Sequence, residues 1–414
     1  MAATETQLRN TYRFMAPMVR SALSPRDITC AMFKGDFRLS LSQGEQRKHA
    51  YVLDELRITE DSLFLDVGFG WGSLLEAARE RGAKAVGVNK ETGQVRFARS
   101  LGLNVVEGSY RDFLTVNNPV QFDGISCVEA MEHFCGPEDY VAGEQDAIYG
   151  DFFARAAEHL VDGGRMYHQS MVLGKDVPRF DDISTDAPPF SREYIAAKVM
   201  EFYPGSWPPE SVDQIIRAAA PYFDVLEVDN GTADYIETMK RWSELWRPNT
   251  RTILPILSLA AKALLDPNIR KRIGLLRQGY NRQCFEKGVL ELSRILFQKK
   301  SDVFKPENAA NIASYLSGKL SGMGLPDIGV DSTDELLDTV YSGDNAILYV
   351  HKNTGKVLVL DKIPGIVSAN PESARLWIHG KRWEETTQLY TEAASKDLNS
   401  RDFWQSWSRQ FWRG

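Results

Sequence analysis

The sequence predicts an α/β protein with a doubly wound, Rossmann-like and mostly parallel sheet, a helical cover, and a small carboxy-terminal α+β extension. Two observations carry this prediction. Short apolar runs alternate with segments of helical spacing between residues 61 and 300, and a glycine-rich loop follows the first run. Strands that alternate with helices in this way form parallel sheets, because parallel neighbours need a crossover connection. Sheets of this kind bind ligands at the carboxyl ends of their strands.

The predicted elements follow one another at short intervals. Apolar runs predict strands at residues 63–67, 84–89, 104–109, 122–128 and 165–172. Helical spacing with a glycine at the end predicts helices at residues 73–82, 93–102 and 150–164. The stretch from about 232 to 300 is expected to be helical as well.

The chain is expected to have three parts. Residues 1–60 form an N-terminal helical cover segment, residues 61–300 form the main α/β domain, and residues 301–414 form an extension of unknown role. Within the main domain, residues from about 175 to 250 are interpreted as a cover over the ligand site, because their first part is rich in proline, aspartate and aromatic residues.

The extension has two features of its own. DNAILYVHKNTGKVLVLDK predicts a hairpin with Asn353-Thr354-Gly355 in the turn. The tail concentrates tryptophans, which favours a helix packed back on the protein, then a homo-oligomer interface, and last a membrane-surface contact. These tryptophans are Trp377, Trp383, Trp404, Trp407 and Trp412.

The composition argues against several classes of function. The chain has 414 residues, of which 43% are hydrophobic and 25% charged, as in a folded cytoplasmic enzyme. A formal net charge of -7 argues against a nucleic-acid partner. The most apolar stretch is too short for a transmembrane segment. The four cysteines show neither a disulfide framework nor the spacing of a metal site, so no metal is predicted.

A glycine loop, LDVGFGWG, follows the first predicted strand and contains Asp66, Gly68, Gly70 and Gly72. Glycines at this place let the backbone approach a ligand, and the next helix presents its positive end there. A tight turn that packs helix on strand explains them equally well. The alternative ligand is a dinucleotide. The G-x-G-x-G spacing and the missing acid at the second strand's tip count against it, but Glu91 lies at a ribose-binding distance and keeps NAD open.

The fourth predicted strand ends in VEAMEHF, which gathers three ionisable side chains. Glu129, Glu132 and His133 fall within five residues, directly after Val128. Such side chains at the carboxyl end of a parallel strand indicate proton transfer or the binding of a charged substrate. Glu132 and His133 are also suited to capping the helix that follows.

The glycine loop resembles motif I of class I S-adenosylmethionine-dependent methyltransferases, and more narrowly that of the cyclopropane fatty acid and mycolic acid synthase family. Further similar segments follow in the family's order and cover roughly residues 10–300. They are DITCAMF, VGVNKETGQ, EGSYRDF, EHFCGPEDY, MYHQS, FYPGSWPP and TADYIETMKRW. Because an ordered set is more specific than any single motif, the main domain is expected to be a methyltransferase domain.

The resemblance implies S-adenosyl-L-methionine as the cofactor. The glycine loop would shape its pocket, Asn89 and Gln94 would contact the ribose and amino-acid parts, and Ser109 and Tyr110 would lie beside the adenine. The complete set of cofactor-binding residues expected from the resemblance is Asp66, Gly68, Gly70, Gly72, Asn89, Gln94, Ser109, Tyr110 and Val128.

The resemblance also implies a bicarbonate ion near the reactive methyl group. In the family a cysteine, a glutamate, a histidine and a tyrosine hold it, and these correspond to Cys30, Glu132, His168 and Tyr235. Methylation of an olefinic carbon leaves a carbocation, and bicarbonate would be the base that removes a proton. The expected reaction is transfer of a methyl or methylene group to a lipid or isoprenoid-like substrate. Each of these residues taken alone is explained as well by packing.

Several positions depart from the family. Glu129 stands where the lipid-acting members usually have glycine, and plant alkaloid N-methyltransferases have a similar E-x-x-E-H arrangement. Glu129, Glu132 and His133 would then handle a small-molecule amine, so N-methylation is the alternative function. Phe69 and Phe297 replace two cysteines of the family, the second of which is sometimes considered catalytic.

Overall fold

The structure, a computed structural model, divides the chain into two compact units, Met1–Ser301 and Asp302–Gly414. In the first unit, the described residues are 26–115, 120–245 and 252–300, together with 12, 16, 19, 23, 247, 248 and 250. In the second unit, the backbone is described for residues 331–332, 337–342, 346–351 and 357–361.

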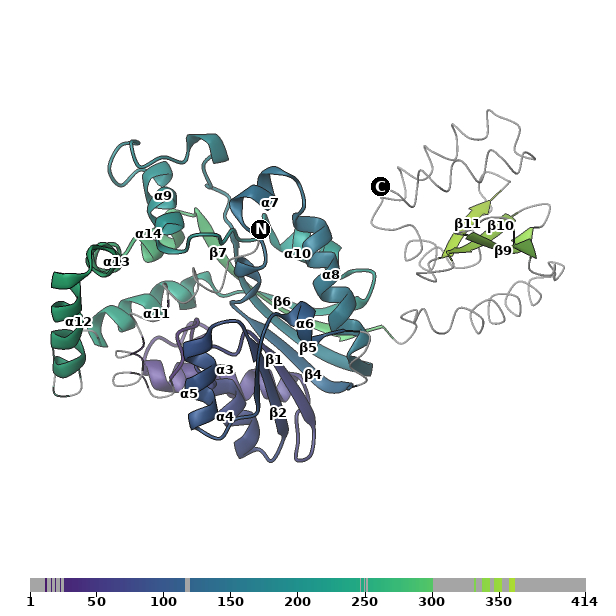
Figure 1. Cartoon of the computed structure of the whole chain (residues 1–414), viewed down its shortest axis with the longest axis horizontal. Coiled ribbons are helices and arrows are strands. Elements are labelled where there is room, and N and C mark those ends of the chain that lie inside the picture. Colours follow the sequence, from purple (N-terminus) through teal and green to yellow (C-terminus); the bar gives the residue numbers. More distant parts are fainter. Residues whose placement is uncertain are drawn as a thin grey trace. The chain divides into compact units, whose positions relative to one another are not determined.

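A seven-stranded sheet with the order β3-β2-β1-β4-β5-β7-β6 forms the centre of the first unit (Figure 1). Its strands are β1 (Leu63–Val67), β2 (Lys84–Asn89), β3 (Val105–Glu107), β4 (Phe122–Val128), β5 (Leu160–Leu173), β6 (Phe223–Asn230) and β7 (Leu290–Lys299). Only β7 runs antiparallel to its neighbours β5 and β6. The strand order reverses between β1 and β4, which places a ligand crevice at their carboxyl ends.

Helices flank this sheet and also build a separate cover. They are α3 (Leu41–Glu55), α4 (Ser73–Glu80), α5 (Thr92–Ser100), α6 (Tyr110–Phe113), α7 (Pro137–Val141), α8 (Gln145–Glu158), α9 (Arg192–Phe202), α10 (Val212–Ala219), α11 (Thr232–Leu245), α12 (Ile253–Leu265), α13 (Pro267–Gln278) and α14 (Tyr280–Glu286), with short 3-10 turns at Met131–His133 and Phe180–Asp182. Figure 1 shows α9 and α11 to α14 gathered in one group. No helix among the described residues is long and apolar enough to cross a bilayer.

The five predicted strands are confirmed, but the prediction for the residues after 222 is partly wrong. Residues 290–299 were expected to be helical and instead form β7, which lies inside the sheet between β5 and β6. Its side chains are buried along nearly the whole strand, so a two-residue alternation is absent from the sequence. The predicted helix at 150–164 also ends early, because β5 already begins at Leu160. Strand β6 was not predicted.

The two faces of the sheet have separate cores that decide which side chains reach the crevice. On the face covered by α3, the ring of Tyr167 on β5 contacts Tyr51. On the face covered by α8, Phe153 contacts Phe297 of β7 and His168 of β5. Neighbouring residues of β5 therefore point to opposite faces, as the pleat of a strand requires.

The second unit contains a four-stranded antiparallel sheet in the order β11-β10-β9-β8. Its strands are β8 (Asp331–Ser332), β9 (Leu337–Ser342), β10 (Ala346–His351) and β11 (Val357–Asp361). The antiparallel pairing of β10 with β11 confirms the two strands of the predicted hairpin. The predicted turn at 353–355 and the tryptophan-rich tail lie outside the described residues.

Candidate active site

A cavity of about 1240 Å³ lies at the carboxyl ends of β1, β2, β4 and β5 and extends under the cover helices. Many of the predicted site residues line it together: Gly68, Gly70, Asn89, Gln94, Ser109, Tyr110, Val128, Glu129, Glu132, His133 and Tyr235. Asp66, Gly72, Cys30 and His168 are not part of its lining. The crevice expected at the reversal of strand order is therefore present, and most of the predicted residues converge on it.

The glycine loop requires its glycines for different reasons. Gly68, Gly70 and Gly72 have φ values of 79°, 54° and 87°, which favour glycine. A Cβ on Gly68 would collide with Ala130, and one on Gly72 would lie 2.6 Å from Leu103. A Cβ on Gly70 would meet nothing within 4 Å, because that residue borders the cavity. The loop thus packs tightly on the protein side and is open on the ligand side.

The polar groups at the end of β2 are held in place by one another. Asn89 donates from Nδ2 to Oε1 of Gln94 at 2.9 Å. Glu91 is buried and caps α5, because its Oε2 accepts from the backbone N–H of Gln94 at 2.6 Å. The carboxylate of Glu91, which left NAD possible as a ligand, therefore has a structural role at the start of α5.

Glu129 is the most tightly held acid of the site. Its Oε1 accepts hydrogen bonds from the backbone N–H of Cys30 at 2.7 Å and from Nε2 of Gln169 at 2.8 Å. Its Oε2 accepts one from the hydroxyl of Tyr235 at 2.7 Å. Burial raises the pKa of Glu129, although these three donors and the charge of Lys48 oppose that shift.

The orientation of Gln169 follows from its own partners. Its Oε1 accepts from Nε of Arg294 on β7 at 3.1 Å and from the hydroxyl of Tyr167 at 3.1 Å. A side-chain amide that accepts from two donors on one side presents its NH2 on the other. Gln169 is therefore a donor toward Glu129 and has no basic atom there.

Glu132 has one oxygen in use and one without a partner. Its Oε1 accepts from the backbone N–H of Met171, the residue two positions after Gln169 on β5. Its Oε2 is buried and has no hydrogen-bond partner among the described residues. Burial, followed by the nearby charge of Glu129, raises the pKa of Glu132 to about 8. Both effects favour the protonated form of this carboxyl at neutral pH.

His133 lies in the same cavity with both ring nitrogens occupied. Nε2 is 2.9 Å from the hydroxyl of Tyr12, and Nδ1 is 2.6 Å from the hydroxyl of Ser206. Burial lowers the pKa of His133 to about 4, so the ring is neutral. A neutral imidazole with both nitrogens in hydrogen bonds is well placed to position neighbouring hydroxyls.

His168 does not lie where the sequence predicted. It is buried on the α8 face of β5, its ring contacts Phe153, and it is absent from the cavity lining. Both ring nitrogens have no hydrogen-bond partner among the described residues, and burial lowers the pKa to about 3. The prediction that His168 reaches the crevice is wrong, because its neighbour Gln169 points that way. The period-two alternation of strand side chains was the signal that could have distinguished them.

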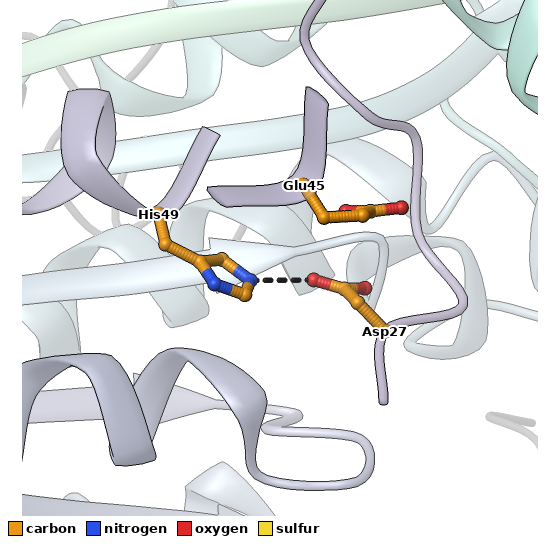
Figure 2. A group of neighbouring side chains, drawn as sticks. All are labelled: Asp27, Glu45 and His49. Atoms are coloured by element: carbon orange, nitrogen blue, oxygen red, sulfur yellow. Dashed lines mark hydrogen bonds and ion pairs between the residues drawn. The ribbon is translucent and has the colours of Figure 1, made fainter. Parts of the chain in front are cut away.

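Cys30 contributes its backbone, and a buried ionic cluster anchors the segment that carries it. Lys48 bridges the carboxylates of Asp27 at 2.9 Å and Glu45 at 2.6 Å, while His49 lies 2.7 Å from Asp27. Figure 2 shows the two acids and the imidazole converging in the manner of metal ligands. The ammonium group of Lys48 already supplies the cation between the acids, so the cluster is explained as a structural ion-pair network.

The chain is similar in sequence to lipid-modifying enzymes. It is 24% identical over 230 residues to sphingolipid C9-methyltransferase of Komagataella phaffii, which covers 52% of this chain and 43% of that protein. It is 27% identical over 245 residues to hydroxymycolate synthase MmaA4 of Mycobacterium tuberculosis, covering 56% and 75%. It is 28% identical over 221 residues to cyclopropane-fatty-acyl-phospholipid synthase of Escherichia coli, covering 52% and 50%. The chain thus spans only about half of two of these relatives.

The fold is shared with solved methyltransferase structures. The cyclopropane synthase MmaA2 from Mycobacterium tuberculosis aligns with a TM-score of 0.57 and 17% identity over 72% of this chain and 99% of that one. The mycolic acid cyclopropane synthase CmaA1, solved with SAH and CTAB, aligns with a TM-score of 0.56 and 20% identity over the same shares. Coclaurine N-methyltransferase aligns with a TM-score of 0.53 and 17% identity over 69% and 78%.

A family model assigns the chain directly. The model described as mycolic acid cyclopropane synthetase matches residues 14–270, which is more than half of the 414 residues. The match includes the glycine loop, both glutamates of the site and Tyr235. With the strand order and the cavity already described, the chain belongs to the mycolic acid cyclopropane synthetase family of S-adenosylmethionine-dependent methyltransferases.

Proposed function

We propose that this protein transfers a methyl or methylene group from S-adenosylmethionine to an olefinic carbon of a lipid or isoprenoid-like substrate. The observation that carries the proposal is the cavity, whose two ends differ in chemistry. The end at the sheet presents the glycine loop, Asn89, Gln94 and the two glutamates. The end under the cover is lined by apolar side chains such as Val199, Leu259, Leu276 and Phe285.

The apolar end is suited to a long hydrocarbon rather than to a small polar molecule. The cavity as a whole measures about 1240 Å³, which exceeds the roughly 300–1,000 Å³ of common small-molecule sites. Apolar side chains from α9, α12, α13 and α14 contribute to the lining, so a flexible chain would be surrounded on several sides. Burying such a chain removes apolar surface from water, which supplies binding energy without specific polar contacts.

The proposed reaction needs three contributions from the protein. The cofactor, when bound, supplies an electrophilic methyl group. The glycine loop and the polar groups at β2 would hold the cofactor, while the cover excludes water from the carbocation that an attacked alkene becomes. The aromatic rings of Phe202, Tyr203 and Trp207 line the cavity and could stabilise the cation by their faces. A base then takes a proton from carbon, either a bound bicarbonate, as the resemblance implies, or a carboxylate of the chain.

The direct test is product analysis with a labelled methyl donor. The full chain would be incubated with S-adenosylmethionine labelled in its methyl group and, separately, with unsaturated phospholipid vesicles, unsaturated fatty acids, prenyl compounds and small amines. We expect label on a carbon of an unsaturated chain, with no transfer to the saturated counterpart. Transfer to amine nitrogen alone would replace the proposal with its alternative.

N-methylation of a small amine is the second candidate. It is favoured by the meeting of Glu129, Glu132 and His133 in one cavity. Against it stands the geometry of His133, since both ring nitrogens already bind the hydroxyls of Tyr12 and Ser206. If the amine reaction is the true one, Glu129→Ala should weaken amine binding strongly, because an ammonium group would lose its carboxylate partner.

A further inference from the structure

The groups that the resemblance assigns to a bicarbonate ion already bind a side chain of the protein. The backbone N–H of Cys30 and the hydroxyl of Tyr235 both donate to Glu129. The third donor comes from Gln169 on β5, while His168 faces away from the cavity. A bicarbonate in this place would compete with the carboxylate of Glu129 for the same donors, and two anions at one site repel each other. The residues present therefore do not fit a bound bicarbonate.

We propose that the carboxylate of Glu129 takes the place of bicarbonate and is itself the base of the reaction. This inference rests on the proposed function, since it names the group that removes the proton from the methylated substrate. A carboxylate matches the planar, two-oxygen acceptor face that bicarbonate would present to the same donors. The protein thus carries its anion covalently and needs none from solution.

The backbone at Glu129 supports a selected role for this side chain. Its φ is 50°, in the left-handed region that favours glycine. An L-residue with a Cβ is strained in that conformation. Glycine would adopt this conformation without that cost, so the strain arises from the side chain. Three hydrogen bonds offset it and hold the carboxylate at one position.

The hydrogen bonds also leave room for a proton. A carboxylate has about four lone-pair positions, and Cys30, Gln169 and Tyr235 use three of them. Oε1 accepts twice and Oε2 once, which leaves one position on Oε2. Glu129 lines the cavity, so its side chain borders the space open to a substrate. Of the three partners, a backbone amide and a side-chain amide cannot serve as bases, and the phenol of Tyr235 donates its proton to the carboxylate.

The proposed step balances without a co-reactant. The π electrons of the alkene form the bond to the transferred methyl carbon, and the S–C bond electrons return to sulfur. A C–H bond next to, or on the methyl of, the resulting cation then breaks. Its electrons form the C=C bond or the ring C–C bond, and its proton joins Oε2 of Glu129. The proton later leaves to water when product is released.

The test replaces Glu129 with glycine and asks whether an added anion then restores turnover. Glu129→Gly suits the positive φ and opens the space of the carboxylate. We expect turnover of the olefinic lipid to fall at least about 100-fold in this variant and to recover partly with added bicarbonate or formate. Glu129→Gln is the matched control, because it fills the space without a base and should not be rescued. Wild-type turnover should be unchanged in CO2-free buffer.

A binding measurement separates this inference from the proposed function. ¹³C-bicarbonate NMR should show a bound signal with Glu129→Gly and none with the wild type, whatever the substrate is. Wild-type turnover that falls in CO2-free buffer, or a bound bicarbonate signal in the wild type, would overturn the assignment to Glu129. Methyl transfer to amines alone would instead contradict the proposed function. The ¹³C-bicarbonate NMR result would still show whether Glu129 excludes the bicarbonate ion. Calorimetry with S-adenosylhomocysteine checks that each variant keeps the cofactor site.

A different observation concerns the outer face of the cover. Helix α12 lines the cavity with one face, through residues such as Leu259 and Ala263, and has no buried residue. Its other face exposes leucines, with Leu254 at 73%, Leu264 at 78% and Leu265 at 88% exposure. The adjacent helix α13 adds basic side chains. Large apolar residues this exposed on a soluble helix indicate a contact surface.

We infer that this face of α12 and α13 docks on an anionic lipid surface and passes the substrate into the cavity. Within residues 253–278 there are five basic residues and a single acid, Asp266, although the whole chain has a net charge of -7. Lys262, Arg270 and Lys271 are exposed, whereas Arg272 donates to the carbonyl of Phe202 and Arg277 lines the cavity. Leucines beside lysines and arginines are typical of helices that lie in a bilayer interface.

Vesicle sedimentation of the full chain tests this surface. We expect binding to phosphatidylglycerol vesicles and weak binding to phosphatidylcholine vesicles. Combined Leu254→Ser, Leu264→Ser and Leu265→Ser should weaken the first at least about tenfold, whereas Val141→Ser on α7, also an exposed apolar residue, should not. Equal binding by the triple variant would overturn the inference. So would a change from dimer to monomer with unaltered vesicle binding, since the face would then be covered by a second copy.

Discussion

The sheet edge and the helical cover form one cavity but are built in opposite ways. At the edge, each functional group is fixed by buried strands and by hydrogen bonds across the sheet, as with Gln169 between Arg294 and Glu129. In the cover, α12 and α13 have no buried residues and line the cavity with apolar side chains, and α12 also exposes leucines to solvent. The groups proposed to react therefore lie in the rigid part of the protein, while the proposed substrate would contact the more weakly packed cover.

The largest expected effect is on the network behind the site. Arg294 is buried, binds Asp234 at 2.8 Å and donates to Gln169 and to the carbonyl of Ala31. Arg294→Met would leave the carboxylate of Asp234 buried without its cationic partner. We expect the free energy of unfolding to fall by about 3–5 kcal/mol, measured by chemical denaturation. If the free energy of unfolding falls by less than about 1 kcal/mol, the sheet edge is not held rigidly by Arg294.

The pH dependence of stability should report the buried acid at the edge. The pKa of Glu132, raised to about 8, lies above its unfolded value. Its contribution to stability is therefore fully present below the unfolded pKa and is lost as pH rises through 8. Between pH 5 and 9 the unfolding free energy of the wild type should fall by up to roughly 4 kcal/mol more than that of Glu132→Gln.

Denaturation at several pH values measures this difference. Asp66, whose pKa is also raised, to about 7 by burial, contributes in the same window in both proteins and cancels in the comparison. Parallel curves for the wild type and Glu132→Gln would mean that Glu132 is not the titrating group.

The glycine loop offers a matched pair of substitutions. Gly70→Val places a branched side chain at φ 54° and at the cavity border. We expect calorimetry to show at least about 100-fold weaker binding of S-adenosylhomocysteine, or about 2.7 kcal/mol. Gly150→Ala lies inside α8, where an added Cβ meets nothing within 4 Å, and should leave binding unchanged while stabilising the helix by about 0.5–1 kcal/mol. Unaltered binding by Gly70→Val would show that the glycine loop is not part of the cofactor site.

The smallest effect is expected in the cover. Leu265→Ala removes apolar atoms that are already in water, so the free energy of unfolding should change by less than about 0.5 kcal/mol. Leu53→Ala, the same substitution at a fully buried position of α3, should cost about 2–5 kcal/mol. Similar losses for the two variants, measured by denaturation, would show that α12 is packed in solution and would end the contrast between the two regions.

Much of the edge was predictable because its signals are local. The apolar runs at β1, β2 and β4 and the glycines between β1 and α4 depend on neighbours within a few residues. The acids of VEAMEHF were placed correctly for the same reason, since a parallel strand delivers whatever follows it to its carboxyl end. Strand β7 was missed, because a strand buried on both faces has the same apolar composition as a buried helix.

By itself, the sequence determined the α/β order of elements, the family and the residue types that gather at the sheet edge, because each of these depends on short-range patterns. Only the tertiary structure decided that Gln169 and not His168 faces the cavity, since the parity of a strand is set by pairing with β4 and β7 far away in the chain. It also decided that Cys30, Gln169 and Tyr235 converge on Glu129. These residues are separated by up to 205 positions, and only packing brings their donors within 2.8 Å of one carboxylate.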